Sequence, residues 1–127
     1  MKNEFILKAK ENLKAAELLF ENGLYNASAN RSYYAALHAA VAALTTIGIK
    51  YEPISHKTTQ ANFSAELIQR RKVYPSRLKS YLTELQDTRN DADYRIKSVS
   101  KNLASKQLAK SKEFINQIAT EVGDVQL

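Results

Sequence analysis

Apolar residues recur every three or four positions along most of the chain, which is the spacing of one face of an α-helix. The first such stripe consists of Ile6, Ala9, Leu13, Ala16 and Phe20. Gly23 follows at a natural C-cap position, so we predict a helix over about residues 3–22. No segment alternates apolar and polar residues with the period of a strand, and no sheet is predicted.

Four further helices are expected from the same pattern, over about residues 26–47, 55–69, 76–97 and 101–122. The three glycines and two prolines fall near the predicted helix ends. Ser55 is a suitable N-cap for the helix over 55–69. Long amphipathic helices with short connections pack as an antiparallel bundle. The predicted fold class is therefore an all-α, antiparallel bundle of four to five helices, forming a single domain over residues 1–127.

The predicted helix over residues 26–47 is apolar around nearly its whole circumference. One stripe consists of Tyr33, Leu37, Ala40, Leu44 and Ile47. The opposite side carries Tyr34, Ala35 and Ala42. Such a helix is buried on several sides, either by neighbouring helices or by a second subunit. A homodimer is therefore expected.

Arg31 and His38 interrupt this helix. They are seven residues apart, so they project from almost the same side. A buried guanidinium needs a carboxylate, a ligand phosphate or access to water. For His38, a neutral imidazole hydrogen-bonded within the core is the alternative to a functional role.

The predicted helix over residues 76–97 contains a charge where its apolar stripe requires an apolar residue. The stripe positions are Leu78, Leu82, Leu85, Arg89, Ala92, Ile96 and Val99. Asp93 lies one turn after Arg89 and can hold the guanidinium in a charge-assisted pair. Departures from folding rules of this kind concentrate at functional sites. The alternative is a salt bridge that only fixes the helix register.

The net charge of +6 is unevenly distributed. Residues 70–112 contain twelve Lys or Arg and four Asp or Glu, whereas the rest of the chain has seven basic and nine acidic residues. A basic surface of this kind attracts phosphate, which favours a nucleic-acid partner. An ordinary solvated basic surface is the alternative.

Other features exclude several classes of protein. The chain has no cysteine, which excludes disulfides and thiolate metal sites. No apolar stretch approaches the roughly 20 residues that span a membrane, and the N-terminal segment does not resemble a secretion signal. The sequence has no glycine-rich phosphate loop, metal-binding spacing or nucleophile elbow. A cytoplasmic protein without a metal, a cofactor or membrane contact is expected.

Three segments resemble motifs of the HEPN domain family, in its branch of small stand-alone proteins. They are residues 31–40 (RSYYAALHAA), 55–57 (SHK) and 89–94 (RNDADY). The resemblance implies a bundle of four or five helices that is usually a homodimer and binds RNA or a nucleotide. Many members of the family are metal-independent ribonucleases, often toxins encoded beside a minimal nucleotidyltransferase that acts as antitoxin.

The family's catalytic signature is incomplete in this chain. The signature is an Arg, a polar residue directly after it, and a His after four to six residues, with two copies meeting at the dimer interface. Arg89 is followed by Asn90, but Tyr94 stands where the His belongs, and no His follows His56. Arg31 and His38 have the right spacing, but they lie on the earlier helix. An unperturbed Tyr, with a pKa of about 10, is a poor base near neutral pH.

Three functions are therefore weighed. The first is a HEPN-type RNA- or nucleotide-binding protein, the toxin-like partner of a nucleotidyltransferase. The second is an active metal-independent ribonuclease, and the third is a helical adaptor that packs against a partner protein. The predicted catalytic residues are Arg89, Asp93, Tyr94 and His38. The predicted RNA- or nucleotide-binding residues are Arg31, Tyr34, His56, Lys57 and Asn90, where His56 and Lys57 begin a helix and can contact a phosphate.

Overall fold

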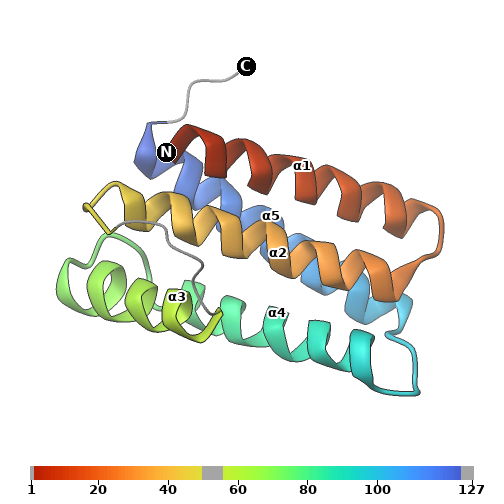
Figure 1. The fold of residues 1–127 in the computed structure, drawn as a ribbon. Helices are drawn as coiled ribbons and strands as arrows, with labels where there is room; N and C mark the ends of the chain where they lie inside the picture. The colour runs from red at the N-terminus through yellow and green to blue at the C-terminus, as the bar shows by residue number, and fades with distance from the viewer. Residues whose placement is uncertain (1, 50–55, 124–127) are drawn as a thin grey trace.

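The computed structural model describes residues 2–49 and 56–123, and all regular structure in these ranges is helical (Figure 1). The elements in chain order are α1 (Lys2–Glu21), α2 (Tyr25–Thr45), α3 (His56–Asn62), η1 (Phe63–Arg70), α4 (Arg77–Tyr94) and α5 (Lys101–Val122). The prediction of an all-α bundle is confirmed. No helix in the described part of the chain is long and apolar enough to cross a membrane.

Helix α2 forms the centre of the bundle. It packs against α1, α4 and α5, and also contacts α3 and η1. Figure 1 shows α1 and α4 on opposite flanks of α2, running in one direction, while α2 and α5 run in the other. The helix α3 lies in the same layer as α4, on the side of α2 away from α1. Any polar side chain on α2 is therefore close to residues of several other elements.

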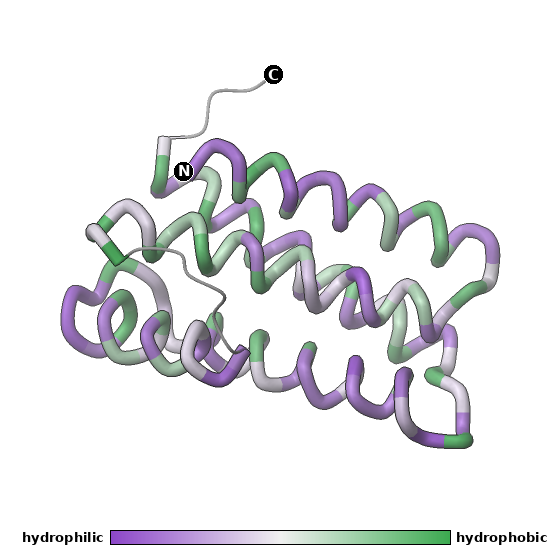
Figure 2. Tube along the Cα trace, viewed as in Figure 1, coloured by the Kyte–Doolittle hydropathy of each residue, from purple (hydrophilic) through white to green (hydrophobic). Residues whose placement is uncertain are grey.

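Neighbouring helices account for the apolar circumference of α2. Thirteen of its residues are buried, most of them alanines whose small side chains allow neighbouring backbones to approach closely. Figure 2 shows α2 in pale and green colours along most of its length, in contrast to the purple stretches of α4. The chain itself covers this helix, so its composition gives no argument for a second subunit.

The end of α4 differs from the prediction. The helix ends at Tyr94 because Arg95 adopts an extended backbone, with φ −96° and ψ 151°. Ile96, predicted in the buried stripe, is fully exposed, so that prediction is wrong. Val99 is buried, but it lies in the loop, where its N–H donates to Asn26 Oδ1 at 2.8 Å. The chain must reverse here to enter α5, and a continuing helix would prevent this.

The third predicted helix is divided into two kinds of helix. The α3 segment continues directly into the π-helix η1, where the Arg71 N–H donates to the carbonyl of Glu66, five residues earlier. Lys72 then takes a left-handed conformation with φ 54°. The proposed N-cap, Ser55, lies outside the described residues. π-helical turns are uncommon and often lie at functional sites, and the periodic pattern does not predict this one.

Candidate functional site

The ring of Tyr34, on the central helix α2, has two guanidinium groups against it. The central carbon of the Arg31 guanidinium lies 4.8 Å from the ring centre, and that of Arg89 lies 5.3 Å from it. The Arg89 Nη2 also donates a hydrogen bond to the Tyr34 hydroxyl at 2.9 Å. Cation–π attraction holds both groups against the ring. Helices α2 and α4 thus bring two positive charges together at one place.

Asp93 balances the charge of Arg89. Its Oδ2 lies 2.9 Å from Arg89 Nε, one helical turn away on α4. The contact is an ion pair without an aligned hydrogen bond, because the buried Nε–H has no acceptor in hydrogen-bond geometry among the described residues. Asp93 also accepts two contacts from the Asn30 amide, at 3.0 and 3.2 Å. The Arg89 side chain is 16% exposed and that of Asp93 is 26% exposed, so the pair is partly shielded from water.

Arg31 has amide partners instead of a carboxylate. Its Nε donates to Asn30 Oδ1 at 2.9 Å, and its Nη1 donates to Asn12 Oδ1 at 3.0 Å. A continuous polar network therefore runs from Asn12 on α1 through Arg31 and Asn30 on α2 to Asp93 and Arg89 on α4. The two arginines and one aspartate of this network leave one positive charge uncompensated, which favours the binding of an anion.

His38 lies one turn after Tyr34 on α2. Its Nδ1 is 2.8 Å from the Tyr34 carbonyl oxygen. In the neutral imidazole this contact requires the proton on Nδ1, which leaves Nε2 as an acceptor. Burial lowers the pKa of His38 below its usual value of 6.5, and the nearby charges of Lys8 and Arg31 lower it further. The side chain is therefore neutral at pH 7 and can accept a proton.

His56, the first residue of α3, packs against the aromatic rings of α2 at this site. Its ring centre lies 5.4 Å from those of Tyr33 and Tyr34. Burial lowers the pKa of His56, with smaller effects from the charge of Arg89 and from His38. Two imidazoles from different helices therefore border the cluster, that of His56 near the charge of Arg89 and that of His38 near the charge of Arg31.

Next to the site, Tyr33, Gln60 and Gln86 form a second group of hydrogen-bonded polar side chains. Tyr33 is fully buried, and its hydroxyl accepts a hydrogen bond from Gln60 Nε2 at 3.2 Å. The same amide donates to Gln86 Oε1 at 2.8 Å, which links α3 to α4. Burial raises the pKa of Tyr33 to about 12, so its hydroxyl cannot serve as a base near neutral pH. The role of Tyr33 is to hold α3 against the site.

Most residues predicted for the site come together around Tyr34. Those in contact are Arg31, Tyr34, His56, Arg89, Asn90 and Asp93, where Asn90 Oδ1 accepts from Arg89 Nη1 at 3.2 Å. Tyr94 lies at the rim, 76% exposed, with its ring centre 5.9 Å from the Arg89 guanidinium carbon. Lys57 is exposed on α3 directly after His56. His38 lies one turn from Tyr34, within electrostatic reach of Arg31 and His56.

Four polar residues of this network are not predicted from the sequence: Asn12, Asn30, Gln60 and Gln86. Asn30 gave one signal, because it is a polar residue directly before Arg31 on a helix with few polar positions. Asn12 gave none, since it lies among other polar residues of α1 and reaches Arg31 only through the packing of α1 on α2.

Exposed basic residues extend along the chain beyond the site. In residues 70–112, five of the twelve basic side chains pair with a carboxylate. Within the described residues, the exposed cations of this segment without an ion pair are Arg71, Lys72, Lys79, Lys97, Lys101, Lys106 and Lys112. These residues provide unneutralised charge for an extended polyanion.

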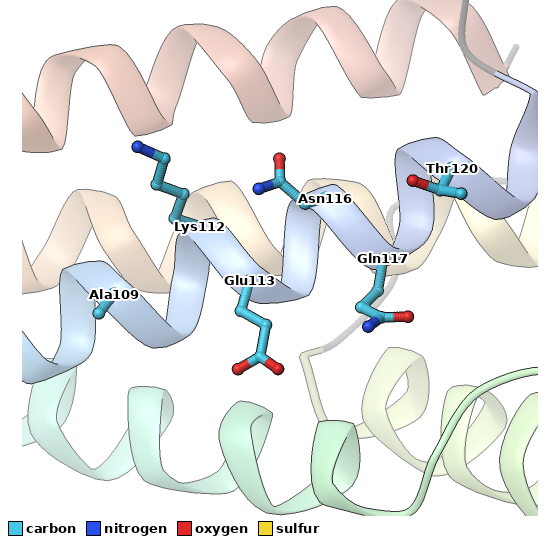
Figure 3. Close-up of a pocket in the computed structure, with 6 residues that line it drawn as sticks. All are labelled: Ala109, Lys112, Glu113, Asn116, Gln117 and Thr120. Carbon is cyan, nitrogen blue, oxygen red and sulfur yellow. The ribbon is translucent and has the colours of Figure 1, made fainter.

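A cavity of about 460 Å³ on α5 is separate from this cluster (Figure 3). Figure 3 shows its side chains diverging, with Lys112 directed toward α1 and Glu113 directed toward α4. Glu113 is already held by Arg77 Nε at 3.2 Å and by the Tyr81 hydroxyl at 2.7 Å. Ligand sites have converging polar groups, so this cavity is not the site. Across residues 2–49 and 56–123, no group of three or more His, Cys, Asp or Glu side chains is placed to hold a metal.

The fold and the site define an all-α protein with an anion-attracting cluster between α2, α3 and α4. The family model of the HEPN domain matches residues 3–121, and the chain belongs to the HEPN domain family. A protein of Methanocaldococcus jannaschii named "Putative toxin MJ0605" is 55% identical over 38 residues, which cover 30% of this chain and 28% of that protein. The chain therefore matches less than a third of the length of this relative.

Proposed function

We propose that this protein is a toxin-like HEPN protein that binds single-stranded RNA through the cluster around Tyr34. The observation that carries the proposal is the convergence of Arg31 and Arg89 on one aromatic ring, with the Asp93 carboxylate beside Arg89. Guanidinium groups bind phosphate oxygens through paired N–H donors. The family match and the name of the relative also support a toxin-like HEPN protein.

The arrangement suits a phosphate from a flexible strand. Among the described residues, the acceptors of the Arg31 guanidinium are the neutral amides of Asn30 and Asn12, so its charge is available to a ligand. Tyr94 is exposed beside Arg89 and can stack on an unpaired base, an interaction worth about 1–3 kcal/mol per base. His56 and Lys57 lie at the start of α3, where they border the same surface. Unpaired RNA can present a phosphate and an unstacked base together, whereas a duplex cannot.

Metal-independent cleavage of RNA is a second candidate, favoured by the imidazoles of His38, near Arg31, and of His56, near Arg89. Cleavage would proceed by attack of the 2′-oxygen on phosphorus and rupture of the bond from phosphorus to the 5′-oxygen. Nε2 of His38 would take the 2′-hydroxyl proton, and His56, in its protonated form, would protonate the leaving oxygen. The products would be a 2′,3′-cyclic phosphate and a free 5′-hydroxyl.

The proposal includes two protein partners, a second copy of this chain and a nucleotidyltransferase. A homodimer and a nucleotidyltransferase antitoxin are both implied by the resemblance of the motifs at residues 31–40 and 89–94 to those of HEPN proteins. Light scattering at micromolar concentration tests the dimer, for which the monomer mass of 14.3 kDa is the contradicting result. Co-purification with a nucleotidyltransferase encoded beside the gene tests the second partner.

Filter binding over a salt series tests the proposed function, with RNA and DNA of one sequence. Each phosphate neutralised on a single strand contributes about −0.7 to the slope of log affinity against log salt. Three contacts should thus weaken binding about a hundredfold for a tenfold rise in salt. The Arg89→Ala variant should lose the preference for RNA over DNA. Absence of binding to either polymer at low salt would favour a helical adaptor.

Incubation of labelled RNA with the protein and a chelator separates binding from cleavage. Products ending in a cyclic phosphate, lost in His38→Gln, would establish the ribonuclease. Intact RNA in a sample that binds it would leave the binding function alone.

A further inference from the structure

A cavity lined by both polar and apolar side chains lies between the α3–η1 segment and the first half of α4. Its volume is about 230 Å³, below the range of roughly 300–1,000 Å³ that holds drug-sized ligands. The lining side chains that can act on a ligand are Gln60, Ser64, Gln69, Lys79, Leu82 and Thr83. The amides and hydroxyls of this lining can bind the edge of a single base, and its apolar atoms can contact the face of the base.

Side-chain contacts connect the lining of this cavity to the Tyr34 site. Gln60 lines the cavity, and its amide holds the hydroxyl of Tyr33 and the side-chain oxygen of Gln86. The ring of Tyr33 in turn lies 5.3 Å from that of Tyr34. Two successive side chains, Gln60 and then Tyr33, therefore separate this cavity from the Tyr34 ring that contacts Arg31 and Arg89.

The spacing along α4 places the cavity beside the phosphate site. Leu82 precedes Arg89 by seven residues, so the two positions lie on one side of the helix, about 10 Å apart along its axis. A neighbouring nucleotide of an extended strand can bridge this distance. The strand would then follow α4 toward its N-terminal end.

Of the unpaired cations in this region, Lys79 lines the cavity, and Arg71 and Lys72 follow two and three residues after Gln69 of the lining. The exposed side chains of Arg71, Lys72 and Lys79 make no ion pair with the described residues. Lys72 is held in a left-handed conformation directly after the π-helix. Such strained backbone is retained at binding sites more often than elsewhere.

The absence of acidic groups on its lining distinguishes this cavity. The groove on α5 contains Glu113, and another groove at the start of α4 contains Glu84. A carboxylate on the lining repels an anionic strand, whereas the neutral amides of Gln60 and Gln69 do not. The π-helical turn also brings Ser64 and Gln69 together, with the Gln69 amide 3.5 Å from the Ser64 hydroxyl.

We propose that this cavity receives the base of the nucleotide adjacent to the one whose phosphate binds at Arg31 and Arg89. The basic side chains of Arg71, Lys72 and Lys79 bind the phosphate on its far side. This inference rests on the proposed RNA-binding function and adds a second subsite to it. Recognition of RNA would then need at least two consecutive nucleotides.

A cavity-filling variant with a matched control tests the subsite. Ala65 lines this cavity and Ala109 lines the α5 groove, and both are exposed on helices. Affinity should be measured for single-stranded RNA of one to four nucleotides. Ala65→Phe should lower the affinity for two or more nucleotides about tenfold and leave that for a mononucleotide unchanged. Ala109→Phe should bind every length like the wild type.

A charge variant keeps the test decisive if Ala65→Phe does not fold. Lys79→Glu should weaken binding of three and four nucleotides, whereas Lys106→Glu, on α5, should have a smaller effect. Wild-type length dependence in folded Ala65→Phe, or in Lys79→Glu, would overturn the subsite and leave the proposed function intact. A wild-type protein that binds RNA of no length would overturn both.

Discussion

Arg31 and Arg89 lie on two neighbouring helices, α2 and α4, and their guanidinium carbons both lie against the ring of Tyr34, at 4.8 and 5.3 Å from its centre. Two like charges in one place repel each other. The structure offsets this repulsion with the Asp93 carboxylate and with the amide oxygens of Asn30 and Asn12. A bound phosphate would add a second negative charge to this cluster. The site thus has a net positive charge before any anion binds.

The hydroxyl of Tyr34 should contribute to stability and to ligand binding. In Tyr34→Phe, the ring remains but Arg89 Nη2 loses its acceptor, which lies at 2.9 Å in the wild type. The free energy of unfolding should fall by about 1 kcal/mol, and RNA affinity should fall because Arg89 is less well positioned. Urea denaturation and filter binding measure the two effects. Tyr94→Phe, at a largely exposed position, is the control and should not change stability.

Removal of Asp93 should cost more stability than removal of Arg89. Asp93→Ala leaves a guanidinium that is only 16% exposed without its counter-charge, and Asn30 loses its acceptor. We expect a loss of roughly 1–3 kcal/mol. Arg89→Ala leaves Asp93 with the Asn30 amide and better access to water, so its loss should be smaller. Equal unfolding midpoints for the two variants would contradict this account.

Stability should decrease as the pH falls below about 6.5. Burial lowers the pKa of both His38 and His56 in the folded protein, below the usual value of 6.5. Below pH 6.5 the unfolded chain therefore takes up protons more readily than the folded protein. The free energy of unfolding is not reduced by these histidines above pH 6.5, and it declines as the pH falls below that value. Denaturation at pH 5, 6, 7 and 8 measures the decline. A double variant, His38→Gln with His56→Gln, should show a flatter profile.

RNA affinity should respond to pH in the opposite direction. A phosphate beside His38 and His56 stabilises the protonated imidazoles, so binding should strengthen as pH falls below 6.5. Filter binding at constant ionic strength measures this effect. The double histidine variant is again the control, and a wild-type affinity independent of pH would place the phosphate away from both rings.

The exposed lysines of α5 should act only through long-range charge. Lys101 and Lys106 make no ion pair within the described residues and lie on the exposed face of the helix. Reversal of both charges should reduce the salt slope of RNA binding by no more than about 0.7 for each phosphate contact that is lost. The preference for RNA over DNA should be retained. Loss of that preference would indicate that α5 contacts the ribose or the bases.

The helices of the bundle follow from the sequence because their signal is local. The apolar stripe of α1 and the glycine that follows it predict its bounds to within about a residue, and the predicted 101–122 helix coincides with α5. The end of α4 was not predicted, because Ile96 continues the apolar period while the chain must turn to enter α5. The π-helix η1 was not predicted either; it packs against α2 and α4, which lie elsewhere in the chain.

Sequence alone also marked Arg89 and Asp93, since charges in an apolar stripe are visible in one helix. Their meaning required the tertiary structure. The contacts of Tyr34 with Arg89 and with His56 join residues far apart in the chain, and no local pattern encodes which side chains meet. For the same reason the sequence left two explanations for the apolar surface of α2, and only the packing of α1, α4 and α5 around it decided between them.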